Sequence, residues 1–178
     1  MKFTDEPAEI LAEGKYLRLV SQGTWEYADR TCASGAVIIV AVTPERKLLL
    51  VEQFRIPLGG HAIELPAGLV GDIPGEEHEA LQIAAERELL EETGFTAADW
   101  QWLMTGPSSP GLCTEMITLF LAKNLTREHA GGGDHTEDIV VHEVGLAELP
   151  QWLEAQHAAG KAIDPKVYAG LYFALHAK

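Results

Sequence analysis

The sequence predicts a mixed α/β sandwich formed by one domain. The chain has 178 residues, 47% of them hydrophobic, which is enough for a soluble domain with a buried core. Predicted strands dominate the middle of the chain and helices flank them, without the regular strand-helix alternation of a parallel sheet. No repeat or Pro/Gly-rich linker divides the sequence. We therefore expect one domain over residues 1–178, with about residues 1–33 forming an N-terminal β extension.

The first half of the chain is predicted to be mostly β-structure. Strands are expected at residues 35–42 and 47–54, joined by a turn, and residues 61–65 are extended. Weaker patterns at 16–20 and 24–28 predict a hairpin around Gln22 and Gly23. A loop is expected from residue 66 to residue 75.

A helix is predicted from about Glu77 to Thr93, ended by Gly94. Leu81, Ala85 and Leu89 recur every four residues, the first turn is acidic, and a glycine suits the left-handed position that ends a helix. Strands follow at residues 100–104, 115–122 and 139–144, and two helices close the chain. The last helix is expected to have Asp164 as N-cap and Pro165 as its first residue. Trp100 and Trp102 alternate on a strand and are expected to pack on the sheet.

The composition excludes several classes of protein. A net charge of −14 repels polyanions, so nucleic acid is not an expected partner. The longest apolar stretches are far below the roughly 20 residues that cross a bilayer, and the N-terminus has no secretory segment, which predicts a cytoplasmic protein. Cys32 and Cys113 form no disulfide framework, and no two histidines have zinc-ligand spacing. A ligand that carries phosphates would need divalent cations to neutralise it.

Three glutamates crowd one face of the predicted helix. Glu88, Glu91 and Glu92 stand at i, i+3 and i+4, so their carboxylates are neighbours. Their repulsion and their place in the last helical turn are both unfavourable. A hard cation such as Mg²⁺ or Mn²⁺ would reverse that penalty, because it prefers carboxylate oxygens. The alternative is a solvated acidic face that Arg87 partly compensates.

These residues lie in a longer pattern that resembles a known family. Glu64-Leu65-Pro66-Ala67-Gly68 precedes the helix, and the chain resembles the Nudix family, whose box reads G-x5-E-x7-R-E-U-x-E-E-x-G-U. The matched positions are Gly68, Glu79, Arg87, Glu88, Leu89, Glu91, Glu92, Gly94 and Phe95. Residues 69–78 separate the first two positions, five more than the pattern has, and Glu76 competes with Glu79 for the first glutamate.

The resemblance implies a Nudix-type mixed-sheet α/β/α sandwich and a set of functional residues. Glu88, Glu91 and Glu92, with the carbonyl of Ala67, are expected to bind Mg²⁺ or Mn²⁺, and Glu91 and Arg87 belong to the expected catalytic set. The loop at 134–138 is similar to a mobile catalytic loop, and the three glycines before it would form a hinge. Glu137 is the expected general base, with Asp134 and Asp138 as rivals and a merely solvated loop as the alternative.

Outside the box, the chain resembles the ADP-sugar diphosphatase branch. In Glu52-Gln53-Phe54-Arg55, the arginine corresponds to one that contacts the diphosphate, and Ser109-Pro110-Gly111 resembles an element linked to ADP-ribose specificity. The resemblance also assigns substrate contacts to Glu64, Glu115, Trp25 and Glu26, with the tryptophan stacking on adenine, often across a dimer. For Arg55, Trp25 and Glu115, ordinary surface or packing roles remain the alternative. A homodimer is therefore expected.

The combined pattern predicts a metal-dependent hydrolase of a nucleoside diphosphate sugar. ADP-ribose is the leading substrate, and its products would be AMP and ribose 5-phosphate. The alternatives are a GDP-mannose or dinucleoside polyphosphate hydrolase and a sensor that binds ADP-ribose without cleaving it. The intact acidic helix favours the enzyme.

Overall fold

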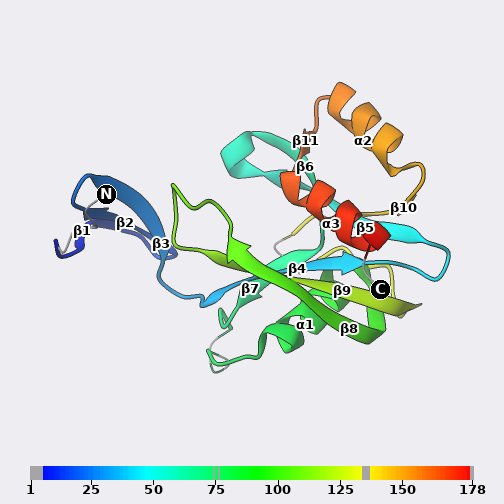
Figure 1. The fold of residues 1–178 in the computed structure, drawn as a ribbon, viewed down its shortest axis with the longest axis horizontal. Helices are drawn as coiled ribbons and strands as arrows, with labels where there is room; N and C mark the ends of the chain where they lie inside the picture. The colour runs from blue at the N-terminus through cyan, green and yellow to red at the C-terminus, as the bar shows by residue number, and fades with distance from the viewer. Residues whose placement is uncertain (1–5, 74, 76, 134–136, 177–178) are drawn as a thin grey trace.

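The computed structural model describes residues 6–73, 75, 77–133 and 137–176. A small N-terminal sheet stands beside a larger α/β body (Figure 1). The sheet is antiparallel in the order β1-β2-β3 and consists of β1 (Glu9–Glu13), β2 (Leu17–Gln22) and β3 (Trp25–Arg30). The predicted hairpin is therefore confirmed, and Gly23 takes the left-handed conformation in its turn. The strand β1 was not predicted.

The body contains two four-stranded sheets. One has the order β7-β4-β9-β8 and consists of β7 (Ala67–Val70), β4 (Gly35–Ala41), β9 (Met116–Arg127) and β8 (Phe95–Pro107), with β4 parallel to β9. The other has the order β10-β5-β6-β11 and consists of β10 (Val140–Gly145), β5 (Lys47–Arg55), β6 (Gly60–Glu64) and β11 (Ala162–Ile163). The short 3-10 helix η1 (Ile56–Leu58) joins β5 to β6.

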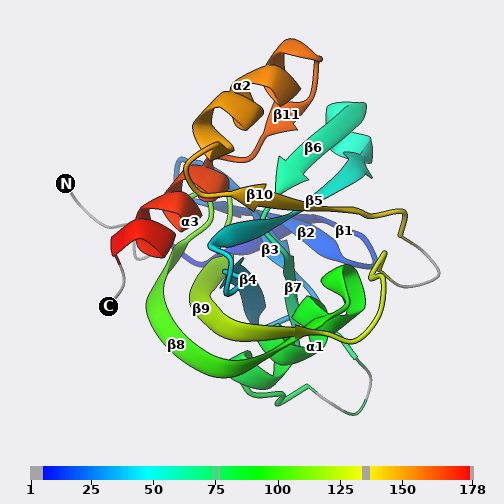
Figure 2. The same cartoon turned by 90° about the vertical axis from the view of Figure 1, so that its right-hand side faces the viewer.

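Helices cover the two sides of the body. The helix α1 (Leu81–Thr93) lies on one side, and α2 (Leu149–Ala158) and α3 (Pro165–His176) lie on the other (Figures 1 and 2). Side chains of β4 alternate between two buried clusters. Ile38 and Val40 join the cluster under α2 and α3, whereas Val37 and Ile39 join the cluster under α1. Burial on both faces explains why β4 is almost uniformly apolar.

Two predicted elements differ from the structure. The expected loop at 66–75 contains β7, because Ala67–Val70 pairs antiparallel with β4. The helix α1 begins at Leu81 instead of Glu77, so the predicted acidic first turn is wrong. Glu79 lies just before the helix with its side chain only 4% exposed, bound to Arg87. This tertiary contact outweighs the local preference for an acidic first turn.

The C-terminal end of α1 and the N-terminal end of α3 agree with the prediction. Gly94 closes α1 at φ 75°, and its N–H bonds to the carbonyl of Leu90. Before α3, the Asp164 carboxylate accepts a hydrogen bond from the Lys166 N–H at 2.8 Å, as expected of an N-cap. Both features are set by neighbouring residues.

The two tryptophans of β8 have different surroundings. Trp100 packs edge to face against Phe120, as expected, with ring centroids 6.3 Å apart. Trp102 is 58% exposed, so its predicted packing role is wrong. The β8–β9 register shifts between Trp102 and Met104, which changes the regular alternation of faces at this point. Within the described part of the chain, no helix combines the length and apolar character needed to cross a membrane.

Candidate active site

Two of the three glutamates on the acidic face of α1 are largely buried in the protein. The side chain of Glu92 is almost completely buried, and Glu88 is 13% exposed, whereas Glu91 is 47% exposed. The Glu92 carboxylate accepts a hydrogen bond from the backbone N–H of Ala67 at 3.0 Å. This bond links the last turn of α1 to the first residue of β7. The three glutamates therefore differ in environment although they share one helical face.

Gly68 leaves room for the side chain of Glu88. A β-carbon at residue 68 would lie 1.9 Å from the Glu88 carboxyl carbon and one of its oxygens. The absence of a side chain at residue 68 therefore accommodates this glutamate. The backbone of β7 thus helps to set the position of the carboxylate.

Burial makes the charged forms of two glutamates unfavourable. It raises the pKa of Glu88 to about 7, although Arg87 acts in the opposite direction, and the charges of Glu91 and Glu137 raise it further. Burial raises the pKa of Glu92 well above its usual value, and the charges of Glu88 and Glu137 add to the effect. The Ala67 N–H and the more distant charge of Arg55 favour the ionised form of Glu92. Without a bound cation, the folded protein therefore favours the protonated forms of Glu88 and Glu92.

Arg87 lies among the acidic side chains. Its guanidinium donates to Glu88 at 2.7 Å and to Glu79 and Glu91 at 3.3 Å. It also donates to the carbonyl of Leu69 at 3.3 Å, which connects α1 with β7. These contacts place Glu79 beside the box arginine, while its rival Glu76 lies outside the described residues. Arg87 orients several carboxylates at once.

The donor chemistry of this site fits a hard divalent cation. Mg²⁺ and Mn²⁺ prefer oxygen ligands, and desolvated carboxylates gain from a nearby cation. Within the described ranges, no three acidic, histidine or cysteine side chains already form a group that could hold a metal ion. The bond between Arg87 and Glu88 uses one of the carboxylate oxygens that a metal would need. Metal binding at Glu88, Glu91 and Glu92 would therefore require a local rearrangement of side chains.

Arg55 and Glu64 form a pair close to this acidic face. They lie at the ends of the adjacent strands β5 and β6, and the Arg55 Nε donates to the Glu64 carboxylate at 2.7 Å. The Arg55 side chain is 41% exposed, and its charge acts on Glu92. Arg55 therefore presents a fixed positive charge between solvent and the acidic helix.

The chain that leads to Glu137 is attached to the end of α1. The N–H groups of Gly132 and Gly133 donate to the carbonyls of Glu92 and Glu91 at 2.9 and 3.1 Å. This attachment brings Glu137 close enough for its charge to act on both Glu88 and Glu92. Both Glu137 and its rival Asp138 are exposed, and Asp134 lies outside the described residues.

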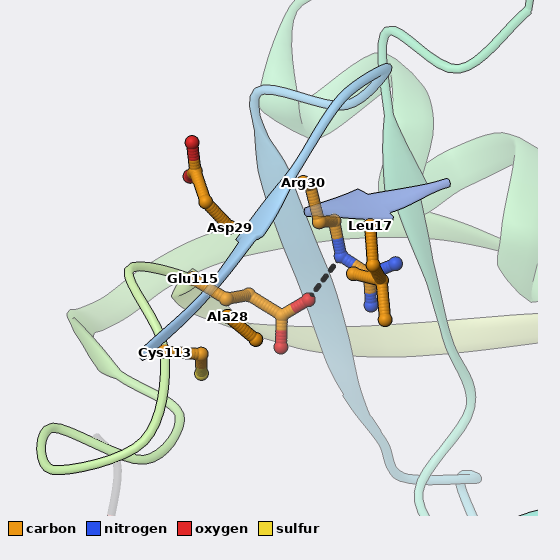
Figure 3. A pocket seen from close by; sticks show the side chains of 6 residues that line it. All are labelled: Leu17, Ala28, Asp29, Arg30, Cys113 and Glu115. Carbon is orange, nitrogen blue, oxygen red and sulfur yellow. Dashed lines mark hydrogen bonds and ion pairs between the residues drawn. The ribbon is translucent and has the colours of Figure 1, made fainter. Parts of the chain in front are cut away.

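The other predicted substrate residues lie at the N-terminal sheet. Trp25, 50% exposed, and Glu26, also exposed, begin β3. Glu115 lies before β9 and accepts a hydrogen bond from the Arg30 Nε at 2.5 Å (Figure 3). The pair borders a cavity of about 180 Å³ whose other lining residues are Leu17, Ala28, Asp29 and Cys113. Arg30 was missed from the sequence, because nothing local connects it with a partner 85 residues away.

The predicted residues thus form two groups. Arg55, Glu64 and Glu137 gather around the acidic helix with the box residues, whereas Trp25, Glu26 and Glu115 lie on the N-terminal sheet or where it meets the body. Backbone bonds hold that junction together: the Ala28 N–H donates to Leu112 at 2.8 Å, and the Thr114 N–H donates to Ala28 at 3.2 Å. Both cysteines are free, as expected.

The fold and the carboxylate-bearing helix define the class to which this protein belongs. The chain is a member of the NUDIX domain family, whose model matches residues 34–169. This match confirms the resemblance inferred from the box.

Several known proteins are similar to this chain. It is 39% identical over 121 residues to the methanol dehydrogenase activator of Bacillus methanolicus, covering 67% of this chain and 63% of that protein. It is 37% identical over 123 residues to the ADP-ribose pyrophosphatase of Bacillus subtilis, covering 68% and 64%. The GDP-mannose pyrophosphatase of Enterobacter sp. is 32% identical over 139 residues, covering 73% and 70%. The match thus spans a little under two thirds of each Bacillus relative.

A solved structure shares the fold. The crystal structure of an ADP compounds hydrolase superposes with a TM-score of 0.69 at 23% sequence identity, covering 93% of this chain and 88% of that one. This likeness confirms the predicted α/β sandwich.

We predict that Gly68→Ala weakens manganese binding by roughly tenfold or more, because the new methyl group displaces Glu88. Isothermal titration calorimetry with Mn²⁺ measures this effect. Gly14→Ala is the control, because a β-carbon there meets only the Leu17 carbonyl at 3.4 Å, an ordinary contact. Unchanged affinity in Gly68→Ala would contradict the role given to Glu88.

We also predict that the metal-free protein becomes less stable as the pH rises from about 4.5 through 7. The pKa values of Glu88 and Glu92 are raised in the folded state, so that state holds more protons than the unfolded chain in this range. In a chelator at pH 8, Glu92→Gln should be more stable than the wild type, because it removes the cost of the buried charge. The difference should shrink toward pH 4.5.

Urea unfolding with EDTA at pH 5, 6.5 and 8 measures this dependence. Glu86→Gln is the matched control on the same helix, because Glu86 forms only an exposed bond with Gln82. A wild type more stable than Glu92→Gln at pH 8 would show that the buried charge is compensated within the protein.

Proposed function

We propose that this protein is a divalent-metal-dependent hydrolase that cleaves the diphosphate bridge of a nucleoside diphosphate sugar, with ADP-ribose as the leading substrate. The products are AMP and ribose 5-phosphate. The observation that carries this proposal is the buried carboxylate face of α1, bonded to Ala67 and close to Arg55 and Glu137. The relative in Bacillus subtilis named ADP-ribose pyrophosphatase supports the choice of substrate.

Glu88, Glu91 and Glu92, together with the carbonyl of Ala67, are the proposed ligands of Mg²⁺ or Mn²⁺. When bound, such cations neutralise the diphosphate and stabilise charge that develops on the bridging oxygen. Arg87 keeps the carboxylates in position through its bonds to Glu88 and Glu91. The carboxylates of this face would attract the cations, and the bound cations would in turn attract the anionic diphosphate.

Arg55 and Glu137 have the proposed roles of phosphate ligand and general base. Arg55 donates to the diphosphate, and Glu64 holds its guanidinium in place through the 2.7 Å bond. Glu137 accepts a proton from a water molecule while the oxygen of that water bonds to phosphorus. The bond from phosphorus to the bridging oxygen breaks at the same time. Asp138 is the described rival for this role.

The N-terminal sheet has a proposed role in binding the nucleotide through a homodimer. Trp25 exposes a ring suited to stacking on adenine, Glu26 lies beside it in sequence, and Glu115 is the proposed contact for the terminal sugar. Ile10, Leu11 and Leu19 are also exposed on this sheet. Such an apolar surface favours association with a second copy.

A second candidate substrate is GDP-mannose. The Enterobacter relative with this name supports it, and its hydrolysis would use the same metal ligands. Dinucleoside polyphosphates and binding of ADP-ribose without cleavage are further outcomes that an assay distinguishes.

We expect Glu92→Gln to reduce turnover by roughly a hundredfold or more, because it removes a charged ligand of the cation while preserving an oxygen for the Ala67 N–H. ADP-ribose, GDP-mannose and a dinucleoside polyphosphate are incubated with Mg²⁺, and the released monophosphates are measured. Glu86→Gln should retain activity. Tight binding of ADP-ribose by the wild type, with no product from any compound, would favour a sensor.

We expect the protein to be a dimer, and Trp25→Ala to raise KM for ADP-ribose by roughly tenfold, because a stacked aromatic ring contributes about 1–3 kcal/mol. Light scattering measures the mass, and initial rates give KM and kcat. Tyr16→Ala is the control, since it removes another exposed ring, from the turn between β1 and β2. A monomeric protein, or an unchanged KM, would exclude the shared binding site.

A further inference from the structure

Glu52 is a buried carboxylate at the centre of a polar cluster that has no part in the proposed chemistry. Its carboxylate is bonded to the Lys161 Nζ at 2.7 Å and the His142 Nε2 at 2.9 Å, and the His61 Nδ1 lies 3.4 Å away. The residue is only 8% exposed. Burial alone would raise the pKa of Glu52, but the bonds from Lys161 and His142 outweigh it and lower the pKa. Glu52 is therefore a stable anion.

The members of the cluster lie on three strands of one sheet and directly before the fourth. Glu52 lies on β5, His61 on β6 and His142 on β10, and Lys161 immediately precedes β11. The helix α2 also contributes. Its Trp152 ring lies 5.0 Å from the His142 ring, and its Gln156 accepts a bond from Lys161 at 2.8 Å. One carboxylate thus links side chains of three strands with the residue that precedes β11, and two of its partners contact α2.

The cluster faces away from the candidate active site. Successive side chains of a strand point to opposite faces, so Glu52 and Arg55 lie on opposite sides of β5. The burial pattern agrees, because Leu48 and Leu50 join the core under α2 and α3 whereas Leu49 joins the core under α1. Glu52 therefore acts on the site only through the backbone of its strands.

The strands that Glu52 connects carry three residues of the proposed site. Arg55 ends β5 and Glu64 ends β6. In the antiparallel register, Glu52 stands opposite Val140, which begins β10 three residues after Glu137. The positions of Arg55 and Glu137 thus depend on strands whose side chains contact the buried Glu52 carboxylate or lie opposite it.

We propose that Glu52 is a positioning residue that fixes the strand ends carrying Arg55, Glu64 and Glu137 relative to one another. This inference rests on the proposed function. The Lys161 ammonium supplies the positive charge in the cluster, so the two histidines and the carboxylate do not need a metal ion. A buried ion pair contributes little net stability, whereas it specifies one geometry well. That property suits a residue that sets positions.

The test compares Glu52→Gln and Lys161→Met with the wild type, well below their unfolding temperatures. We expect kcat for ADP-ribose to fall by roughly ten- to a hundredfold, because small displacements of reacting groups are costly. KM should also rise as Arg55 shifts, whereas Mn²⁺ affinity should not change, because α1 and β7 lie outside the cluster. Lys161→Arg should restore most of the activity by returning the cation. Glu143→Gln is the control, since it breaks only exposed ion pairs on β10.

Amide hydrogen exchange on the same variants reports the strand ends without requiring activity. We expect faster exchange at residues 52–60 and 139–142 and unchanged exchange in α1. Lower melting temperatures with kinetics and exchange like those of the wild type would overturn the inference and leave a purely stabilising cluster. A wild type without turnover on any diphosphate would instead remove the proposed function, and the exchange rates would then decide the positioning role alone.

Discussion

The candidate site depends on two carboxyl groups, those of Glu88 and Glu92, that are largely buried at the end of α1. Glu92 lies inside the protein with one bond from the Ala67 N–H, and Gly68 makes room for Glu88. Arg87 is shared among several carboxylates and cannot neutralise them all. Because transfer of an unpaired carboxylate from water is costly, these groups are relieved either by taking up a proton or by a cation that binds beside them. This burial is the physical basis of the proposed cation binding, and through it of the proposed phosphate binding.

Two buried glutamates show how environment decides the use of the same side chain. On one side of the body, Glu52 has a lysine and a histidine within hydrogen-bond distance, and its pKa is lowered. On the other side, Glu92 has a single backbone donor and acidic neighbours, and its pKa is raised. The compensated carboxylate connects strands, whereas the uncompensated one remains available for a ligand. The proposed positioning cluster and the candidate active site therefore lie on opposite sides of the body.

Features that depend on neighbouring residues were predictable from the sequence. The spacing of Glu88, Glu91 and Glu92, the glycine at the end of α1 and the cap of α3 all act within a few positions. The strand β7 was missed because its partner β4 lies far away in the chain. The same reason hid the bond of Arg30 to Glu115, 85 residues apart, and that of Lys161 to Glu52, 109 residues apart. A charged residue in a sequence shows its chemistry, but only the fold supplies its partner.

The N-terminal sheet is subject to a different constraint, the need to bury an apolar face. A small sheet is stable when it has an apolar face to bury, yet all five residues of β1 are exposed in one chain. Backbone bonds to residues 112–114 hold only one edge of the sheet, through β3. In the proposed dimer, a second copy of the chain would provide an identical surface for the exposed Leu19 and Trp25. Dimerisation would then both stabilise this sheet and bring its aromatic ring and acids to the substrate, so that stability and specificity depend on one interface.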